Sequence, residues 1–178
     1  MKATGIVRRI DDLGRVVIPK EIRRTMRIRE GDPLEIYTEL GGEIVLKKYS
    51  PIGELAPFAT QYADILSKTA GVPAIICDRE QVIAAAGIPK REVLEKPISS
   101  ELEITMQNRQ THIAGKGKTL YPIKNFDKEG LVCVPIISSG DLGGSVIFIN
   151  NNNSSSVDDT KLKLAQSAAM FLGKQMES

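Results

Sequence analysis

Arginine is the residue type in this sequence with the clearest chemical pattern. Seven arginines fall within the 22 residues from Arg8 to Arg29, in the stretch RRIDDLGRVVIPKEIRRTMRIR. A guanidinium group donates hydrogen bonds in a planar fork, which fits two phosphate oxygens or the edge of a guanine better than an ammonium does. The pattern therefore indicates a surface that binds a polyanion.

The positive charge is confined to the beginning of the chain. Residues 1–29 contain nine Lys or Arg against three Asp or Glu, whereas residues 54–178 contain 13 basic and 14 acidic side chains. Solvation alone explains why arginines are exposed, but not why they are segregated by sign. The segment has no aromatic side chain that could stack on unpaired bases. We therefore expect double-stranded DNA as the partner.

Two strands and a helix must position these arginines. Residues 4–10 and 15–18 have strand-like sequences, and the DDLG between them predicts a turn in which Gly14 takes a positive φ. Pro19 suits the first turn of a short helix over residues 20–27. On a helical wheel the cations of this helix share one arc, opposite its apolar side chains: Lys20, Arg23, Arg24 and Arg27.

We expect a small N-terminal domain over residues 1–49. Alternation of apolar and polar residues in PLEIYTEL and EIVLKKY, joined at GG, predicts a hairpin with one buried face. The stretch SPIG at residues 50–53 is the expected linker. About fifty residues make a poor core by themselves, so we expect this domain to gain stability by forming a dimer.

A second domain is expected over residues 54–178. Apolar runs predict strands at 72–78, 81–87, 130–137 and 143–150. Helical spacing predicts helices at 54–70, 90–96, 99–109 and 157–176. This order of elements predicts an α+β domain, in which an antiparallel sheet is flanked by its first and last helices.

The first and last helices of the second domain carry apolar seams. The seam of the first helix alternates three and four residues apart, which suits packing against another helix: Leu55, Phe58, Tyr62, Ile65 and Thr69. The last helix gathers apolar side chains on one side: Leu164, Ala165, Ala168, Phe171, Leu172 and Met176. Packed between chains, these helices would form a four-helix bundle that joins two dimers into a homotetramer.

The string DxLGRVVIPxExRR, from Asp11 to Arg24, resembles the N-terminal domain of the AbrB family of bacterial transition-state regulators. The resemblance covers residues 1–49. It implies a β-rich swapped-hairpin barrel in which two chains intertwine as a dimer and present one arginine-rich face. The residues that it implies for DNA binding are Arg8, Arg9, Arg15, Arg23 and Arg24.

The elements that follow are similar in order to those of a sporulation regulator of this family whose second domain is GAF-like. This resemblance implies that residues 54–178 form a GAF-like domain for regulation and oligomerisation. Its ligand-binding residues are unknown, and the sequence leaves open whether the domain also senses a small-molecule effector. The expected function is a DNA-binding, sporulation-type transcription regulator.

The sequence offers two alternative functions. An antitoxin-like module that binds DNA and protein has a barrel of the same class, but residues 54–178 are too apolar and periodic for a disordered toxin-binding tail. An enzyme is not expected, because Cys77 and Cys133 lie in apolar runs, which raise the pKa of a thiol. The AGKGKT at 114–119 lacks the spacing of a phosphate-binding P-loop.

No cofactor, metal or membrane is expected as a partner. A lone His112 rules out a multi-histidine metal site within one chain. The longest apolar run, at 131–137, is too short to span a bilayer, and the first residues lack the apolar core of a signal peptide. We therefore expect the protein in the cytoplasm, associated with the nucleoid.

Overall fold

The computed structural model describes residues 4–117, 119–151 and 157–177 of the chain. The chain divides into two compact units, Met1–Tyr49 and Ser50–Ser178. Each unit has its own secondary structure and is described by itself below.

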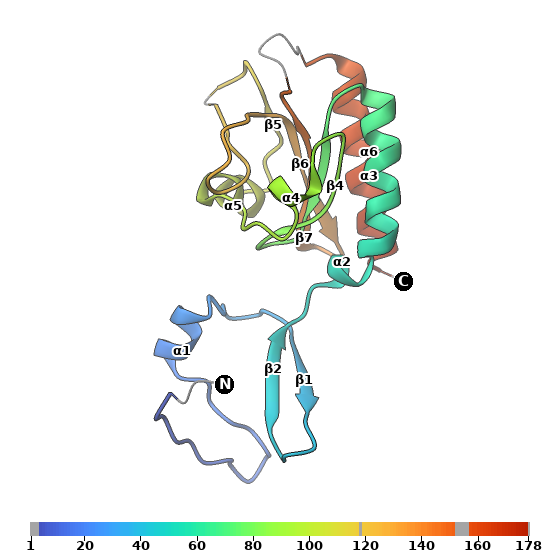
Figure 1. Ribbon diagram of the computed structural model, residues 1–178. Helices are drawn as coiled ribbons and strands as arrows, with labels where there is room; N and C mark the ends of the chain where they lie inside the picture. Colours follow the sequence, from blue (N-terminus) through green and yellow to red (C-terminus); the bar gives the residue numbers. More distant parts are fainter. Residues whose placement is uncertain (1–3, 118, 152–156, 178) are drawn as a thin grey trace. The chain divides into compact units, whose positions relative to one another are not determined.

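The first unit contains one short helix and one hairpin (Figure 1). Helix α1 spans Lys20–Thr25, and strands β1 (Leu34–Thr38) and β2 (Ile44–Lys48) pair antiparallel. The register places Leu34 opposite Lys48 and Thr38 opposite Ile44. The hairpin predicted from alternation and the GG turn is confirmed, but no residue of either strand is buried, so the expected buried face is not present in the described chain.

The segments predicted as the first two strands are not strands in this chain. Residues 4–10 and 15–18 have no ladder partner among the described residues, and a strand exists only where a neighbour completes its hydrogen bonds. Between the two segments, the N–H of Asp11 donates to the carbonyl of Arg15 at 3.1 Å. The two segments therefore form the arms of an open loop that leads into α1.

The expected linker at 50–53 is also wrong. Helix α2 (Pro51–Glu54) begins there, and the Ser50 hydroxyl caps it by accepting the N–H of Gly53 at 3.3 Å. Ile52 is fully buried in the core of the second unit. The physical reason is that a proline and a capping serine favour a helix start, and the burial of Ile52 then fixes the turn to the domain.

The second unit is an α+β domain with a five-stranded antiparallel sheet. Its elements in chain order after α2 are α3 (Ala56–Ala70), β3 (Ala74–Cys77), β4 (Val82–Ala86), α4 (Lys90–Val93), α5 (Ser100–Gln107), β5 (His112–Ile113), β6 (Gly130–Ser138), β7 (Asp141–Ile149) and α6 (Asp159–Gln175). The sheet order is β4-β3-β7-β6-β5. The α+β prediction is confirmed, whereas the short edge strand β5 was not predicted.

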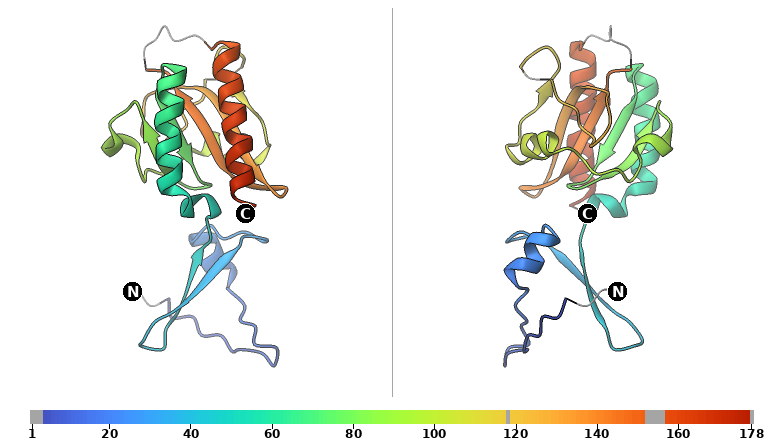
Figure 2. Two further views of the ribbon diagram at one scale, coloured as in Figure 1. Left: turned by 90° about the vertical axis from the view of Figure 1, so that its right-hand side faces the viewer. Right: turned by 60° about the vertical axis from the view of Figure 1, so that its left-hand side comes forward.

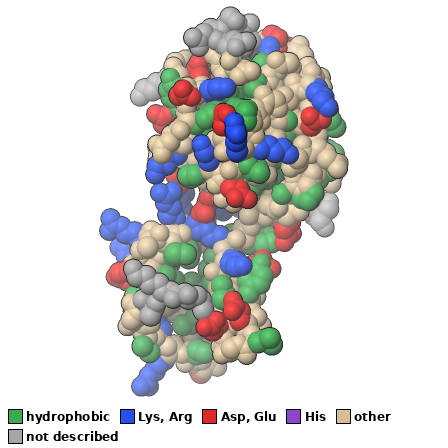
Figure 3. All heavy atoms as spheres, in the orientation of Figure 1, with side chains coloured by type: hydrophobic (Ala, Val, Ile, Leu, Met, Phe, Trp, Pro, Cys, Tyr) green, Lys and Arg blue, Asp and Glu red, His purple; other side chains and the backbone are tan. Residues whose placement is uncertain are grey.

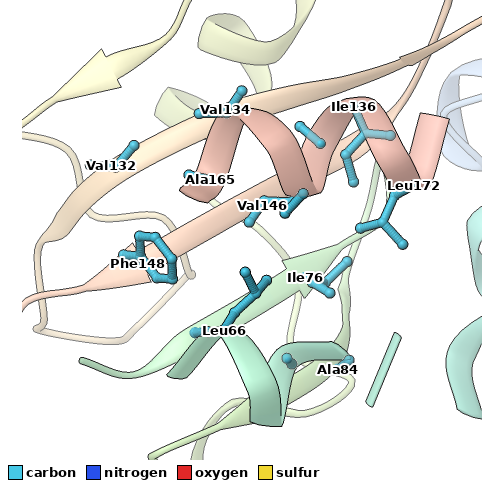
Figure 4. Packing of buried hydrophobic residues seen from close by; sticks show 14 of the residues in the cluster. Leu66, Ile76, Ala84, Val132, Val134, Ile136, Val146, Phe148, Ala165 and Leu172 are labelled. Carbon is cyan, nitrogen blue, oxygen red and sulfur yellow. The ribbon is translucent and has the colours of Figure 1, made fainter. Parts of the chain in front are cut away.

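Helices α3 and α6 lie side by side on the same face of this sheet (Figure 2). Because side chains alternate along a strand, Ile76 faces these helices while Ile75 faces the opposite layer. Leu66, Val146, Phe148 and Leu172 belong to the core beneath the two helices (Figure 4).

The opposite face of the sheet is covered by α4, α5 and the segments around them. Leu102 and Met106 of α5 are buried there with Ile123 and Ile147. The sheet is thus flanked on both faces, and the first and last long helices share one of them.

Candidate nucleic-acid interface and assembly surface

The carboxylate of Asp11 holds the turn at residues 11–14 and also the arginine that follows it. Oδ1 accepts the backbone N–H of Leu13 at 3.1 Å and that of Arg15 at 2.8 Å. Oδ2 accepts Nε of Arg15 at 2.8 Å. These bonds, above all that from the backbone of Arg15, lower the pKa of Asp11 below its ordinary value. Gly14 closes the turn at φ +76°, a conformation that favours glycine.

Helix α1 carries Arg23 and Arg24 at consecutive positions. Pro19 precedes the helix as its N-cap, one position before the first turn where it was expected, and its carbonyl accepts the N–H of Arg23 at 2.9 Å. Arg24 is exposed, whereas Arg23 is half-buried. The Nε of Arg23 is buried without a hydrogen-bond partner in the described chain. A buried donor without a partner is unfavourable, because it loses its hydrogen bonds to water and gains none in return.

The five predicted DNA-contacting arginines fall into two groups in one chain. One group flanks the turn at 11–14, and the other lies on α1: Arg8, Arg9 and Arg15, and Arg23 and Arg24. Arg8 and Arg9 lie on the extended segment before the turn and are exposed, and Arg8 donates through Nη1 to the carbonyl of Val7 at 3.0 Å. Figures 1 and 2 show the turn at 11–14 at the end of the first unit far from α1. In Figure 3 Lys and Arg side chains project outward from this unit. A single chain therefore does not assemble the common arginine face expected from the sequence.

Apolar side chains of the first unit are mostly exposed. Val7 is 84% exposed and Val17 is 72% exposed, and in residues 4–49 the one buried residue is Pro19. Other large apolar side chains of this unit that are exposed are Ile10, Leu13, Val16, Met26, Ile36 and Ile44. A unit of this size cannot be stable with so little apolar burial. The pattern indicates that a second surface covers it.

A cluster of three aromatic rings joins α3 to α6 on the outer side of the second unit. Phe58 and Tyr62 of α3 lie 5.5–5.9 Å, centroid to centroid, from each other and from Phe171 of α6. Phe171 is 42% exposed, and Ile65 and Met170 nearby are also exposed. Aromatic pairs at this spacing attract one another, yet the cluster still presents apolar area to solvent.

The predicted oligomerisation residues of α6 need correction. Ala168 and Leu172 are fully buried in the domain's own core, and Leu164 packs against that core. Leu55, predicted for the seam of the other helix, is half-buried and occupies the N-cap position of α3 without a side-chain hydrogen bond. Only Phe171 of the predicted α6 set lies on the exposed side.

Met170 of α6 is 73% exposed, and it is absent from the predicted set. The alanines of α6 contained the signal, because a small residue repeating every three to four positions marks the side that lies close to a sheet: Ala165, Ala168 and Ala169. The large side chains that fall off this stripe are then on the outside.

The opposite layer of the second unit encloses both cysteines. Cys77 and Cys133 are buried, and burial raises the pKa of each thiol above its ordinary 9.0. His112 lies on the edge strand β5, and its Nε2 is 3.1 Å from the carbonyl oxygen of Gly130. Among the residues described, no group of three or more His, Cys, Asp or Glu could hold a metal ion. No helix within that part of the chain is long and apolar enough to cross a membrane.

Comparisons with known proteins decide the family. Residues 54–177 match the family described as stage V sporulation protein T C-terminal, transcription factor. The whole chain is 49% identical over 179 residues to stage V sporulation protein T of Bacillus subtilis (strain 168), covering 99% of each chain. The chain belongs to the stage V sporulation protein T family of transcription factors. The predicted relationship to AbrB-type sporulation regulators is thereby confirmed.

The first unit of this family member is similar to two further groups. It is 63% identical over 51 residues to the transition state regulatory protein AbrB of B. subtilis (strain 168), covering 29% of this chain and 52% of that one. A solved N-terminal DNA recognition domain of AbrB covers 29% of this chain and 94% of its own length, with a TM-score of 0.25. Residues 7–54 also match the family described as antidote-toxin recognition MazE, bacterial antitoxin.

The second unit has the fold of a GAF domain. It is similar to the GAF domain of the Acinetobacter phosphoenolpyruvate-protein phosphotransferase, with a TM-score of 0.53 over 68% of this chain and 81% of that chain. At 11% identity this likeness concerns the fold alone. The predicted combination of an AbrB-like first domain and a GAF-like second domain is confirmed.

Proposed function

We propose that this protein regulates transcription by binding duplex DNA through the arginines of its first unit. The observation that carries the proposal is a set of guanidinium groups on a segment that is 63% identical to AbrB, whose solved N-terminal part is a DNA recognition domain. These groups belong to Arg8, Arg9, Arg15, Arg23 and Arg24. Guanidinium groups bind phosphates and guanine edges in duplex DNA.

The DNA-binding form is an intertwined dimer of first units. Residues 4–10 and 15–18 are extended without ladder partners in the described chain, and the apolar side chains on them are exposed. A second copy supplies both the missing strand partners and an apolar surface of matching composition. Pairing of this kind brings the turn arginines and the α1 arginines of two chains onto one face, which a single chain does not do.

The experiment is a comparison of two arginine substitutions in the full chain. Arg24→Ala removes an exposed arginine of α1, and Arg91→Ala removes an exposed arginine of the second unit. Fluorescence anisotropy with a mixed-sequence duplex measures the dissociation constant. Arg24→Ala should weaken binding about 10-fold or more, because a hydrogen bond to a charged group contributes roughly 1.5–3 kcal/mol. Arg91→Ala should bind like wild type, and equal losses in both variants would count against the proposed face.

The second unit joins two such dimers into a tetramer. The aromatic cluster of Phe58, Tyr62 and Phe171 offers an apolar surface on two adjacent helices, and four such helices from two chains would bury it. A tetramer carries two arginine faces, so that one face raises the effective concentration of DNA at the other.

A small-molecule effector of the GAF-like unit is a further part of the proposal. The layer between the sheet and α5 is filled by buried side chains such as Leu102, Met106 and Ile123, so an effector that binds there would have to move α5. Thermal unfolding of the protein with fractionated cell metabolites tests this. A fraction that raises Tm and alters DNA affinity supports sensing, and the absence of any such fraction argues for assembly alone.

Binding of a toxin is the second candidate function, because residues 7–54 match the MazE antitoxin family. Against it, residues 54–177 fold as a separate core and do not resemble a disordered toxin-binding tail. Affinity capture from cells that recovers a small toxin would favour this candidate.

We also propose that the protein is not an enzyme and acts on the chromosome in the cytoplasm. The buried thiols of Cys77 and Cys133, with their raised pKa, support the first point because nucleophilic cysteines have a lowered pKa.

A further inference from the structure

We infer that Asp11 is a positioning residue for DNA binding, whose carboxylate holds the guanidinium of Arg15 with its outer edge directed toward the DNA. The inference rests on the proposed function, namely that the arginines of the first unit bind duplex DNA. An acidic side chain on such a surface repels phosphates, so its presence there calls for a compensating role.

The contact between the two side chains uses one edge of the guanidinium. Nε of Arg15 donates to Oδ2 of Asp11 at 2.8 Å, and neither Nη nitrogen makes a hydrogen bond within the described chain. An arginine has donors on two edges, one with Nε and one formed by the two Nη nitrogens. A carboxylate on the Nε side leaves the second edge directed away from Asp11. That edge is able to bind a phosphate or a guanine bidentately.

The solvent exposure of the two side chains indicates that the pair affects DNA binding more than folding stability. The side chain of Arg15 is 70% exposed and that of Asp11 is 38% exposed. Exposed ion pairs contribute little to folding stability. They do restrict a flexible side chain, and a side chain that is ordered before binding loses less entropy when the complex forms.

The backbone of Arg15 is fixed by the same carboxylate. Oδ1 of Asp11 accepts the backbone N–H groups of Leu13 and Arg15, so the position of the Cα of Arg15 and the direction of its guanidinium depend on one residue. The carboxylate is charged at neutral pH with or without these bonds, which lower the pKa of Asp11 further.

Asp12 provides a matched control on the same turn. It is exposed, and it forms no hydrogen bond or ion pair with the described residues. If charge alone mattered, removing either acid would strengthen binding to DNA by a similar factor. If Asp11 positions Arg15, the two substitutions change affinity in opposite directions.

The experiment uses duplexes that the wild-type full chain enriches from a random-sequence library. Dissociation constants are measured by fluorescence anisotropy for wild type, Asp11→Asn, Asp12→Asn, Arg15→Ala and the double variant Asp11→Asn/Arg15→Ala. Asparagine retains an acceptor oxygen for the two backbone N–H groups of the turn. We expect Asp11→Asn to weaken binding about 3- to 10-fold, the range for one side chain that must be ordered on binding. Asp12→Asn should bind as tightly as wild type or more tightly, and Asp11→Asn should cause no further loss beside Arg15→Ala.

Three results would overturn the inference. The first is tighter binding by Asp11→Asn, the second is an equal loss with Asp12→Asn, and the third is a loss that persists beside Arg15→Ala. If Asp11→Asn fails to fold, as circular dichroism would show, Asp11→Glu takes its place. That variant keeps the charge but moves the carboxylate, so it should also bind more weakly, and wild-type affinity would overturn the inference. Failure of wild type to enrich any duplex would instead overturn the proposed function, and the two failures are thus distinguished.

Discussion

At the scale of single residues, contacts rather than residue type separate functional groups from structural ones. Asp11 and Asp12 are adjacent and have the same charge, yet only Asp11 binds an arginine in the described chain. Cys77 and Cys133 carry reactive atoms, but burial keeps both thiols neutral. The sequence could indicate the arginines through their number and segregation. It could not indicate the Asp11–Arg15 pair, because that contact depends on the conformation of the turn.

The buried thiols predict how stability depends on pH. Folding raises the pKa of Cys77 and Cys133 above the ordinary 9.0, so above that pH the unfolded chain loses protons that the folded chain keeps. Stability should therefore be full below about pH 9 and fall above it, by up to roughly 1.4 kcal/mol per pH unit for each thiol. Urea unfolding between about pH 8 and about pH 10 measures this.

The control for the pH prediction is the double variant Cys77→Ala/Cys133→Ala. Its stability is lower at every pH because small cavities form, but its decline between the two pH values should be smaller than that of wild type. An identical decline in both proteins would show that other groups cause it.

At the scale of elements, a strand or helix face was predicted correctly where the segment that packs against it is close in sequence. Strands β1 and β2 were predicted because the hairpin partner is adjacent in sequence. Residues 4–10 and 15–18 have strand patterns but no ladder partner in the described chain. The edge strand β5 was missed because two residues are too few to show alternation. The face of α6 was misjudged because both of its sides carry apolar residues, although the stripe of Ala165, Ala168 and Ala169 marks the side that is buried.

The aromatic cluster predicts how helices α3 and α6 act in assembly. Phe171→Ala removes a 42% exposed ring from the cluster and should shift the protein from tetramer to dimer, with little change in Tm. Size-exclusion chromatography with light scattering measures the mass. Tyr121→Ala is the matched control, because it removes a 44% exposed ring outside the two helices. A tetramer that survives Phe171→Ala, or that is equally lost with Tyr121→Ala, would contradict this assignment.

Substitution tests the assembly surface better than truncation does. A chain that ends before α6 would lose Ala165, Ala168 and Leu172 from the core of the second unit, so the domain itself would unfold. A change in mass would then not distinguish lost assembly from lost folding.

At the scale of the whole molecule, the AbrB-like unit and the GAF-like unit differ in charge and in buried apolar surface. The first unit holds the excess positive charge but almost no buried apolar surface, whereas the second has two well-buried clusters and a nearly neutral balance of charge. The second unit therefore has the larger core, and in the proposed dimer the first would gain stability where a second copy covers it. The balance of charge changes near residue 30, inside the first unit, so it does not mark the boundary between the units, which lies after Tyr49.

In the proposed mechanism, an arginine face formed by two chains neutralises DNA phosphates. The most direct measurement is the slope of the logarithm of duplex affinity against the logarithm of salt concentration. The double variant Arg15→Ala/Arg24→Ala removes four arginines from a dimer. Its slope should therefore be shallower than that of wild type by about 3.6, at about 0.9 for each lost phosphate contact. An unchanged slope in a folded, dimeric variant would show that these arginines do not neutralise DNA phosphates.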